Sequence, residues 1–362
     1  MDPITHALSG ALVALALDPA GASRSPVSRR LRVTTGALAG VFPDAVLWWR
    51  WTDPLAVLST LPNWTHAPLL APLWALLLAV LLASGRRCLR DWPALAVIAG
   101  AAIGAHLVLD LLTANGLSVG WPFTAARHAL PLLHPLDPWL LLVAVVAAGV
   151  AVLRPSWARR AAVGCFAACA CYLLALGHWR EQALAIGERQ ASTRGVSGGA
   201  VHAFPQPLSP LHWQVLVAHE DAFEIAWVRL PLRPGGPAPT AQAAPSATTA
   251  PRHALAAVLG AYRPPAAVRW EFRSRFGEDS GRAELVRSAW NQPEFEPFRR
   301  FSVHTVFSHA EYSSETRQVC AWFYDARFAL PELPPALRFG ACQHMDERTW
   351  SIRRAPGPLP FL

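Results

Sequence analysis

Several histidine and aspartate residues lie inside or at the ends of strongly apolar segments, where ionisable side chains are costly and often functional. His106 and Asp110 are four residues apart, a spacing that places both side chains on one face of a helix. An imidazole and a carboxylate are ligands that borderline divalent cations such as Zn²⁺ take in proteins. The same pair would also suit a hydrogen bond between packed helices, so the spacing alone leaves both interpretations open.

Three more residues extend this pair from other apolar segments. His6 lies near the start of the first segment, Asp44 near the end of the second, and His66 at the start of the third. Each of them is ordinary at a helix end or a membrane surface when it is taken singly. If the segments cross a membrane in alternating directions, however, all five side chains meet near one surface. We therefore predict a divalent metal site, with Zn²⁺ expected, held by His66, His106 and Asp110 and completed by His6 or Asp44.

A metal site of this kind predicts hydrolysis of an ester, phosphoester or amide bond, because a bound divalent ion lowers the pKa of water to about 7. Asp44 or Asp137 would act as general base or orient a ligand. Asp137 precedes Pro138, so an ordinary helix N-cap is the simpler role for it. Arg127, in the long loop over residues 114–136, would bind an anionic head group or extend to the membrane interface.

The composition indicates which elements position these residues. The chain has 362 residues, 53% of them hydrophobic and only 15% charged, which excludes an ordinary cytosolic enzyme and disorder of the whole chain. Residues 1–178 contain 12 Arg, 7 Asp and no Glu, whereas residues 179–362 contain 20 Arg and 17 acidic residues. Six apolar segments, the first one short or re-entrant, have lengths typical of membrane helices. They cover residues 4–17, 33–49, 66–83, 94–112, 138–153 and 161–177.

Arginine residues concentrate in alternate loops, which predicts the orientation. The loops after the first, third and fifth segments contain most of them. These residues are Arg24, Arg29, Arg30, Arg32, Arg86, Arg87, Arg90, Arg154, Arg159 and Arg160. The positive-inside rule makes this face cytoplasmic, so the metal site and the second half of the chain are expected outside. Because these loops account for the basic residues, we expect no nucleic-acid partner; the lipid bilayer is the expected partner, with an amphiphilic substrate at the outer leaflet.

The second half has the pattern of a small mainly β domain. Short runs rich in Val, Phe, Trp and Tyr, for example residues 213–218, 223–230 and 301–307, predict strands. A helix is expected near residues 178–190, and residues 234–251 are rich in Pro, Ala and Thr and predict a disordered loop. Cys320 and Cys342 would form a disulfide if this domain is outside the cytoplasm. The predicted fold is a membrane α-helical bundle (1–178) followed by a mainly β extracytoplasmic domain (179–362).

Several motifs resemble the YdjM-type membrane-bound metal-dependent hydrolases, a bacterial family of inner-membrane proteins. The matching stretches are MDPITHALSGA, VFPDAV, TH of NWTHAPLL, HLVLDLLTANGLSVGWPF and LDPW, within residues 1–140. The resemblance implies an inner-membrane hydrolase with a metal site at His6, Asp44, His66, His106 and Asp110. Val46 stands where the family usually has a second acid, and Leu61, Pro62 and Asn63 replace an HRG-type stretch.

Two other functions fit the same residues. In the first, the His/Asp set holds a structural metal or joins helices by hydrogen bonds, and the outer domain binds a partner. The departures from the family pattern favour this non-enzymatic interpretation. In the second, the set belongs to an ion relay of a transporter. The one-sided placement of the candidates, with no paired broken helices, argues against transport.

Overall fold

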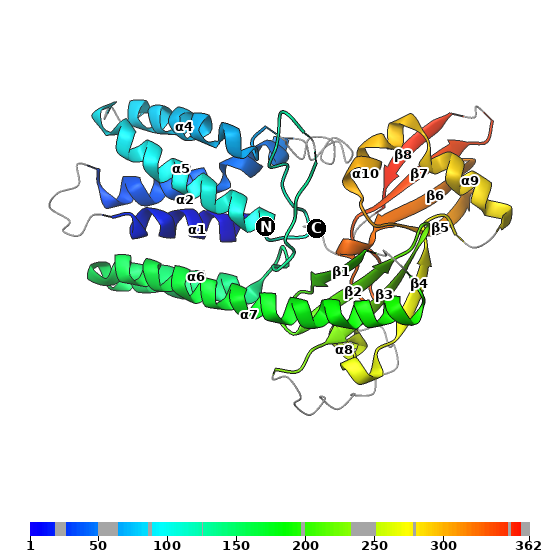
Figure 1. Cartoon of the computed structure of the whole chain (residues 1–362). Coiled ribbons are helices and arrows are strands. Elements are labelled where there is room, and N and C mark those ends of the chain that lie inside the picture. The colour runs from blue at the N-terminus through cyan, green and yellow to red at the C-terminus, as the bar shows by residue number, and fades with distance from the viewer. Residues whose placement is uncertain are drawn as a thin grey trace. The chain divides into compact units, whose positions relative to one another are not determined.

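The computed structural model describes residues 1–18, 27–49, 64–85, 89–124, 126–196, 200–232, 251–277, 280–346 and 349–355. Helices make up most of the first half, and two antiparallel sheets with short helices make up the second (Figure 1). The chain divides into two compact units, the first ending at His178 and the second continuing from Trp179. The loop predicted over residues 234–251 lies outside the described residues except for Pro251, the first residue of α8.

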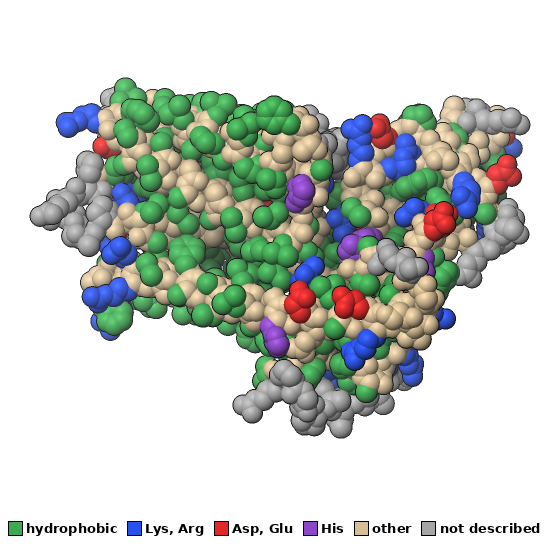
Figure 2. Space-filling view, viewed as in Figure 1, with side chains coloured by type: hydrophobic (Ala, Val, Ile, Leu, Met, Phe, Trp, Pro, Cys, Tyr) green, Lys and Arg blue, Asp and Glu red, His purple; other side chains and the backbone are tan. Residues whose placement is uncertain are grey.

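The helical elements follow the predicted apolar segments. They are α1 (Pro3–Ala16), α2 (Arg29–Trp49), α4 (Ala71–Gly85), α5 (Trp92–Leu111), α6 (Pro138–Leu153) and α7 (Ala158–Thr193), with 3-10 turns η1 (Pro68–Leu70), η2 (Leu89–Asp91) and η3 (Pro155–Trp157). Among the described residues, three helical stretches are long and apolar enough to cross a membrane: Pro68–Gly85, Leu89–Leu111 and Pro155–Thr193. Helices α1 and α6 are apolar but shorter. Hydrophobic side chains predominate on the visible face of the first unit (Figure 2).

Local sequence explains where two of these helices begin. Asp2 caps α1 by accepting from the Thr5 N–H at 2.9 Å, and Asp137 caps α6 by accepting from the N–H groups of Trp139 and Leu140. In both helices a proline occupies the first turn, where its missing N–H leaves no bond unmade. The N-cap geometry predicted for Asp137 from its position before Pro138 is thus present.

Helices α1 and α2 cross with their backbones in contact. A Cβ added to Gly10 would lie 2.1 Å from the carbonyl oxygen of Gly36, and one added to Gly40 would lie 2.4 Å from that of His6. Gly36 and Gly40 form a GxxxG pair on α2, the pattern that lets membrane helices approach closely. This crossing brings the start of α1, which contains His6, against the second half of α2, which contains Asp44.

Helix α7 is longer than predicted. The helix expected near residues 178–190 is present, but it is the continuation of the last apolar segment, which runs without a break to Thr193. Its later part, residues 178–193, is rich in Ala, Arg, Glu and Gln, which favour helix, and it contains no proline. A change from apolar to polar composition therefore changes what surrounds the helix without ending it.

Two four-stranded antiparallel sheets form the second unit. The first has the order β1 (Val201–Pro205), β2 (His212–Ala218), β3 (Ala222–Arg229), β4 (Trp270–Ser274), and the second β5 (Thr305–Ser313), β6 (Gln318–Asp325), β7 (Arg338–His344), β8 (Trp350–Arg354). The remaining helical elements are α8 (Pro251–Ala261), α9 (Ser280–Trp290) and α10 (Glu296–Phe301), with 3-10 turns η4 (Pro265–Ala267), η5 (Pro293–Phe295) and η6 (Ala326–Phe328). The two strands predicted over residues 213–218 and 223–230 are confirmed as the β2–β3 hairpin.

The strand predicted over residues 301–307 is wrong in its first part. Helix α10 ends at Phe301, and β5 begins only at Thr305. Phe298 and Phe301 are both buried, and their spacing of three residues suits a helix face rather than a strand. The aromatic content of this stretch thus reflects the core of the unit and not a strand.

Cys320 and Cys342 form a disulfide. They lie directly opposite each other in the β6–β7 pair. Both are buried, together with Trp322 and Ala355. Strand register therefore brings together two cysteines that are 22 residues apart in the chain.

Candidate metal centre

The predicted ligands meet at one end of the first unit. His6 lies in the first turns of α1, Asp44 in the last turns of α2, His66 just before η1, and His106 and Asp110 in the last turns of α5. Because α1 runs opposite to α2 and α5, its beginning adjoins their ends, as the N-terminus beside the end of α5 shows (Figure 1). The alternation of helix direction thus gathers residues from four separate segments.

Four of these residues form a compact set. Each of Asp44, His66, His106 and Asp110 offers one ligand atom, and the four atoms lie within 4.8 Å of one another. His66 Nε2 lies 3.2 Å from Asp44 Oδ1 and 3.4 Å from Asp110 Oδ2, and His106 Nε2 lies 3.3 Å from the same Asp110 oxygen. The two Nε2 atoms are 3.2 Å apart. Two imidazoles and two carboxylates therefore face one point, which is the donor set that a divalent cation such as Zn²⁺ takes.

The outer nitrogen of each imidazole has its own partner. His106 Nδ1 lies 2.7 Å from the Gly40 carbonyl oxygen, which can only accept, so Nδ1 carries the proton. The Thr65 hydroxyl donates to the Pro43 carbonyl at 3.0 Å, so it accepts from His66 Nδ1 at 3.1 Å. When the rings are neutral, both Nε2 lone pairs then point at the carboxylates. Bonds of this kind fix the tautomer and orientation of metal-ligating histidines.

His6 adds a third imidazole beside this set. Its ring stacks on that of His106 with centroids 3.8 Å apart, and its Nε2 lies 3.3 Å from Asp110 Oδ1 and 3.8 Å from Asp44 Oδ2. The side chain is fully buried, and among the described residues neither ring nitrogen has a hydrogen-bond partner. A buried imidazole without hydrogen bonds, directed at two carboxylates, fits a ligand or proton-carrying role at the same centre.

The charge balance of the site also fits a cation. Asp44 and Asp110 are each about 8% exposed, and the Met1 amino group contacts Asp110 Oδ1 at 2.6 Å. Two buried carboxylates and one ammonium leave one negative charge when the three imidazoles are neutral. Two states of the site can compensate this negative charge. In the first a metal ion is bound, and in the second His66 carries a second proton, so that its Nε2 donates to Asp44. The donor set fits the first state, and the second corresponds to the helix-joining alternative.

Two residues that support the histidines were not among the sequence candidates. Gly40 supplies the carbonyl that accepts from His106, and its missing side chain lets α1 approach. Thr65 orients His66 and is itself 1% exposed. The GxxxG spacing on α2 is a signal for Gly40, whereas nothing in the local sequence distinguishes Thr65 from an ordinary loop residue.

Asp137 lies outside the four-residue set. Its Oδ1 accepts from the backbone of Trp139 and Leu140, and its Oδ2 accepts from the Tyr172 hydroxyl at 3.1 Å. These bonds join the start of α6 to α7. The structure thus shows Asp137 as a helix cap, and its proposed general-base role gains no support from this geometry.

The loop between α5 and α6 is folded against the end of α5. Leu130 donates to the carbonyl of Leu111, and Leu132 and Leu133 both donate to that of Leu112. Arg127 donates to the carbonyl groups of Asn115 and Gly116 at 3.1 and 2.9 Å. Arg127 therefore braces the loop, while its predicted role in substrate binding remains a prediction.

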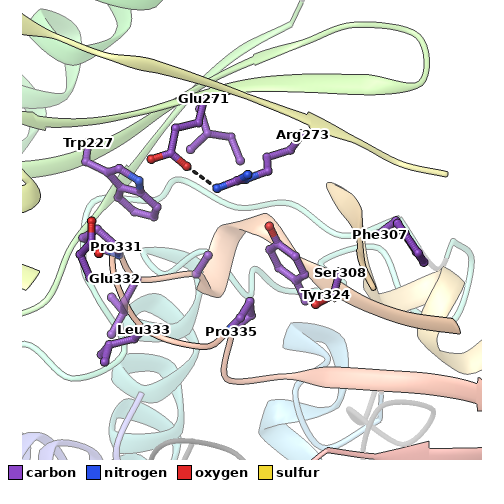
Figure 3. Close-up of a pocket in the computed structure, with 13 residues that line it drawn as sticks. Trp227, Glu271, Arg273, Phe307, Ser308, Tyr324, Pro331, Glu332, Leu333 and Pro335 are labelled. Atoms are coloured by element: carbon purple, nitrogen blue, oxygen red, sulfur yellow. Dashed lines mark hydrogen bonds and ion pairs between the residues drawn. The ribbon is translucent and has the colours of Figure 1, made fainter. Parts of the chain in front are cut away.

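A pocket of about 380 Å³ lies in the second unit between its two sheets. Trp227, Glu271 and Arg273 line it from one sheet, and Phe307 and Tyr324 line it from the other (Figure 3). Glu271 and Arg273 form an ion pair with each other, so these opposite charges compensate within the wall. The pocket shares no residue with the His/Asp cluster.

A second group of histidines lies in this unit. His304 is about 5% exposed, and its ring contacts those of His202, Phe204 and Phe223. Burial, reinforced by nearby His202 and Arg327, lowers the pKa of His304 to about 3. His304 is therefore uncharged at neutral pH and packs among aromatic rings as part of the core.

Apolar helices and a buried His/Asp cluster together define a membrane protein with a site that could bind a metal. The sequence profile of the YdjM inner membrane protein family matches residues 1–183, half of the chain. The chain therefore belongs to this family, and its resemblance to the family is confirmed. No curated protein and no solved structure matches the chain significantly.

Proposed function

We propose that this protein is a membrane-bound, metal-dependent hydrolase whose metal ion is held by Asp44, His66, His106 and Asp110. The observation that carries the proposal is the convergence of these four ligand atoms within 4.8 Å, with the two outer imidazole nitrogens already engaged. Zn²⁺ is the proposed ion, because it accepts imidazole and carboxylate ligands in four-coordinate sites. For hydrolysis one position of the shell must be open to water, so either Asp44 would leave it, or His6 would replace one carboxylate while the other leaves.

The chemistry follows from what each residue does. A bound divalent ion supplies Lewis-acid chemistry, since it lowers the pKa of water and polarises a carbonyl or phosphoryl oxygen. His66 and His106 stay oriented by Thr65 and Gly40, so their Nε2 atoms remain available as ligands. Asp44 or His6, whichever is outside the ligand shell, takes a proton from the attacking water and returns it to the leaving group. Water adds across the scissile ester, phosphoester or amide bond, giving an acid and an alcohol or amine.

The arrangement of charges supports an outward-facing site. The ends of the first-unit helices that lie opposite the cluster have exposed arginines: Arg29, Arg30, Arg90, Arg154, Arg159 and Arg160. If the six helices cross the membrane, the positive-inside rule places these ends in the cytoplasm and the cluster at the outer leaflet. The second unit is then extracytoplasmic, which agrees with its Cys320–Cys342 disulfide.

The alternative is a non-enzymatic membrane protein in which the same residues join the helices. It is favoured by one observation: with a second proton on His66, the contacts with Asp44 and His106 form a hydrogen-bond network that needs no metal. The two states differ in metal content, which makes them separable by experiment.

Metal analysis of the purified full chain tests the proposal. We expect about one equivalent of a divalent ion in the wild type and its loss in Asp110→Asn, since an amide oxygen is a weaker ligand than a carboxylate. Asp137→Asn is the matched control, because Asp137 lies outside the cluster and an asparagine still caps α6. Elemental analysis measures the metal, and thermal unfolding shows whether each variant is folded.

Retention of metal in Asp137→Asn and its loss in Asp110→Asn would support the metal centre. Screening of lipid and phosphoester substrates with the loaded wild type would then test hydrolysis. Absence of metal from the wild type, even after incubation with Zn²⁺, would favour the non-enzymatic alternative.

A further inference from the structure

An apolar cavity of about 280 Å³ lies between α1, α5, α6 and α7 in the first unit. Small side chains create it, because Gly104 and Ala105 of α5 face Ala144 of α6 and Ala170 of α7 across it. A Cβ added to Gly104 would meet no heavy atom within 4 Å. The space therefore results from residues that are too small to fill it.

Among the described residues, no charged side chain lines this cavity, and its hydroxyl groups are already bonded. Thr5 donates to Asp2 at 2.6 Å, and Ser9 donates to the His6 carbonyl at 3.0 Å. A polar ligand would lose its bonds to water here without replacement, whereas an apolar ligand would lose none. The cavity wall therefore favours the binding of a hydrocarbon chain over that of a polar ligand.

The cavity extends along the helices and opens at their surface. Its α5 wall runs from Gly104 to Leu112, about 12 Å of helix at 1.5 Å per residue. Val108 and Phe166, which also line it, are about 56% and 36% exposed. Both belong to stretches apolar enough to cross a membrane, where the surrounding solvent is lipid chains. An acyl chain could therefore enter sideways and lie parallel to the helices.

The cavity and the metal centre share two helices. Thr5 and Leu109 line the cavity, and the next residues along the chain, His6 and Asp110, belong to the His/Asp cluster. One residue along a helix is a rotation of about 100°, so the two sites occupy adjacent faces of α1 and α5. They also reach the same end of these helices, where α1 begins and α5 ends.

We infer that this cavity binds an acyl chain of a membrane phospholipid and so presents the lipid's ester or phosphoester group to the metal centre. The substrate class is then a glycerophospholipid, an assignment that rests on the proposed hydrolase function. Binding of the chain itself depends only on the cavity. The two claims can therefore fail separately.

Photo-crosslinking tests the inference in the full-length protein, reconstituted without metal into vesicles of phosphatidylethanolamine and phosphatidylglycerol. The probe is a phosphatidylethanolamine with a diazirine in one acyl chain. We expect label to concentrate on the cavity residues of α5 and α7. Gly104→Leu should lower that label about fivefold or more, because added methylenes in an occupied site cost at least about 1 kcal/mol.

Gly149→Leu is the matched control, since Gly149 of α6 also has no heavy atom within 4 Å of an added Cβ but does not line the cavity. Its labelling should equal that of the wild type. If Gly104→Leu does not fold, Ala170→Phe fills the cavity from its α7 wall instead. Thermal unfolding identifies the folded variants.

Equal label over all exposed helix faces, or label unchanged in the folded cavity-filling variant, would overturn the acyl-chain site even if the protein binds metal. Concentrated label that the filling variant removes would support it. Concentrated label in a protein that binds no metal would overturn the substrate assignment and the proposed hydrolase, while the lipid site would stand.

Discussion

The histidines of the cluster depend on neighbours that are not ligands themselves. His66 and His106 each have one ring nitrogen engaged, by the Thr65 hydroxyl and by the Gly40 carbonyl. Such bonds orient an imidazole and select its tautomer. The ligand geometry is therefore set by four residues rather than two.

The substitution Thr65→Val tests whether the Thr65 hydroxyl holds His66 in the geometry that metal binding needs. Valine keeps the shape of threonine but neither accepts from His66 Nδ1 nor donates to the Pro43 carbonyl. We expect Zn²⁺ affinity to fall about 10- to 100-fold, the usual effect of losing an outer-shell partner. Competition with a chelating indicator measures the affinity.

Thr65→Ser is the rescue variant, since serine restores the hydroxyl. Its affinity should lie near that of the wild type. Equal affinities for the valine variant and the wild type would mean that His66 is not held by Thr65 when metal binds.

At the scale of elements, the α1–α2 crossing decides whether the cluster can form. Gly10, Gly36 and Gly40 let the two backbones touch, and the contact places His6 beside Gly40. His106 in turn reaches the Gly40 carbonyl from α5. Three helices are thus joined around one glycine-lined contact.

Gly36→Ala tests the crossing, because its Cβ would lie 2.2 Å from the Gly10 carbonyl oxygen. The helices must separate, so we expect the free energy of unfolding to fall by about 1–3 kcal/mol, as in other overpacked sites. Denaturant unfolding in detergent, followed by tryptophan fluorescence, measures it.

Gly149→Ala provides the comparison on α6, where an added Cβ meets no atom within 4 Å. It should leave stability unchanged or raise it by up to about 1 kcal/mol, because alanine favours helix more than glycine does. A Gly36→Ala protein as stable as the wild type would show that the backbones do not touch.

At the scale of the whole molecule, the chain changes character along α7. The helix begins as an apolar stretch able to cross a membrane and ends at Thr193 among residues of the β-rich unit. That unit contains the Cys320–Cys342 disulfide. Disulfides persist mainly in oxidising compartments, so its redox state reports where the unit lies.

We therefore expect Cys320 and Cys342 to be oxidised in cells that make the full-length protein. Alkylation under denaturing conditions should modify both only after reduction, and peptide mass spectrometry distinguishes the two forms. A disulfide that closes 22 residues should also contribute about 3 kcal/mol to the unit's stability.

Cys171 serves as the internal control, because it is a free, exposed thiol that should react without reductant. Alkylation of Cys320 and Cys342 without reduction would place the second unit in a reducing compartment. The proposed outward orientation of the metal centre would then be wrong as well.

Much of this protein is determined locally, and the sequence alone was enough to predict it. Long apolar runs predict helices because each backbone polar group must be satisfied within its own segment in a membrane. The spacing of His106 and Asp110 predicts a shared helix face, and runs rich in Val, Phe and Trp predict the strands of the β2–β3 hairpin. These features depend on residues that are near one another in the chain.

Only the tertiary structure decided the features that join distant segments. Continuation of α7 to Thr193, the Cys320–Cys342 pairing and the bracing roles of Thr65, Gly40 and Arg127 were not predicted or were left open. Each depends on how helices cross or strands align, which short-range patterns do not encode. The candidate ligands could thus be predicted from their residue types. The geometry of their common centre could not, because this depends on the close contact of α1 and α2 that the glycines allow.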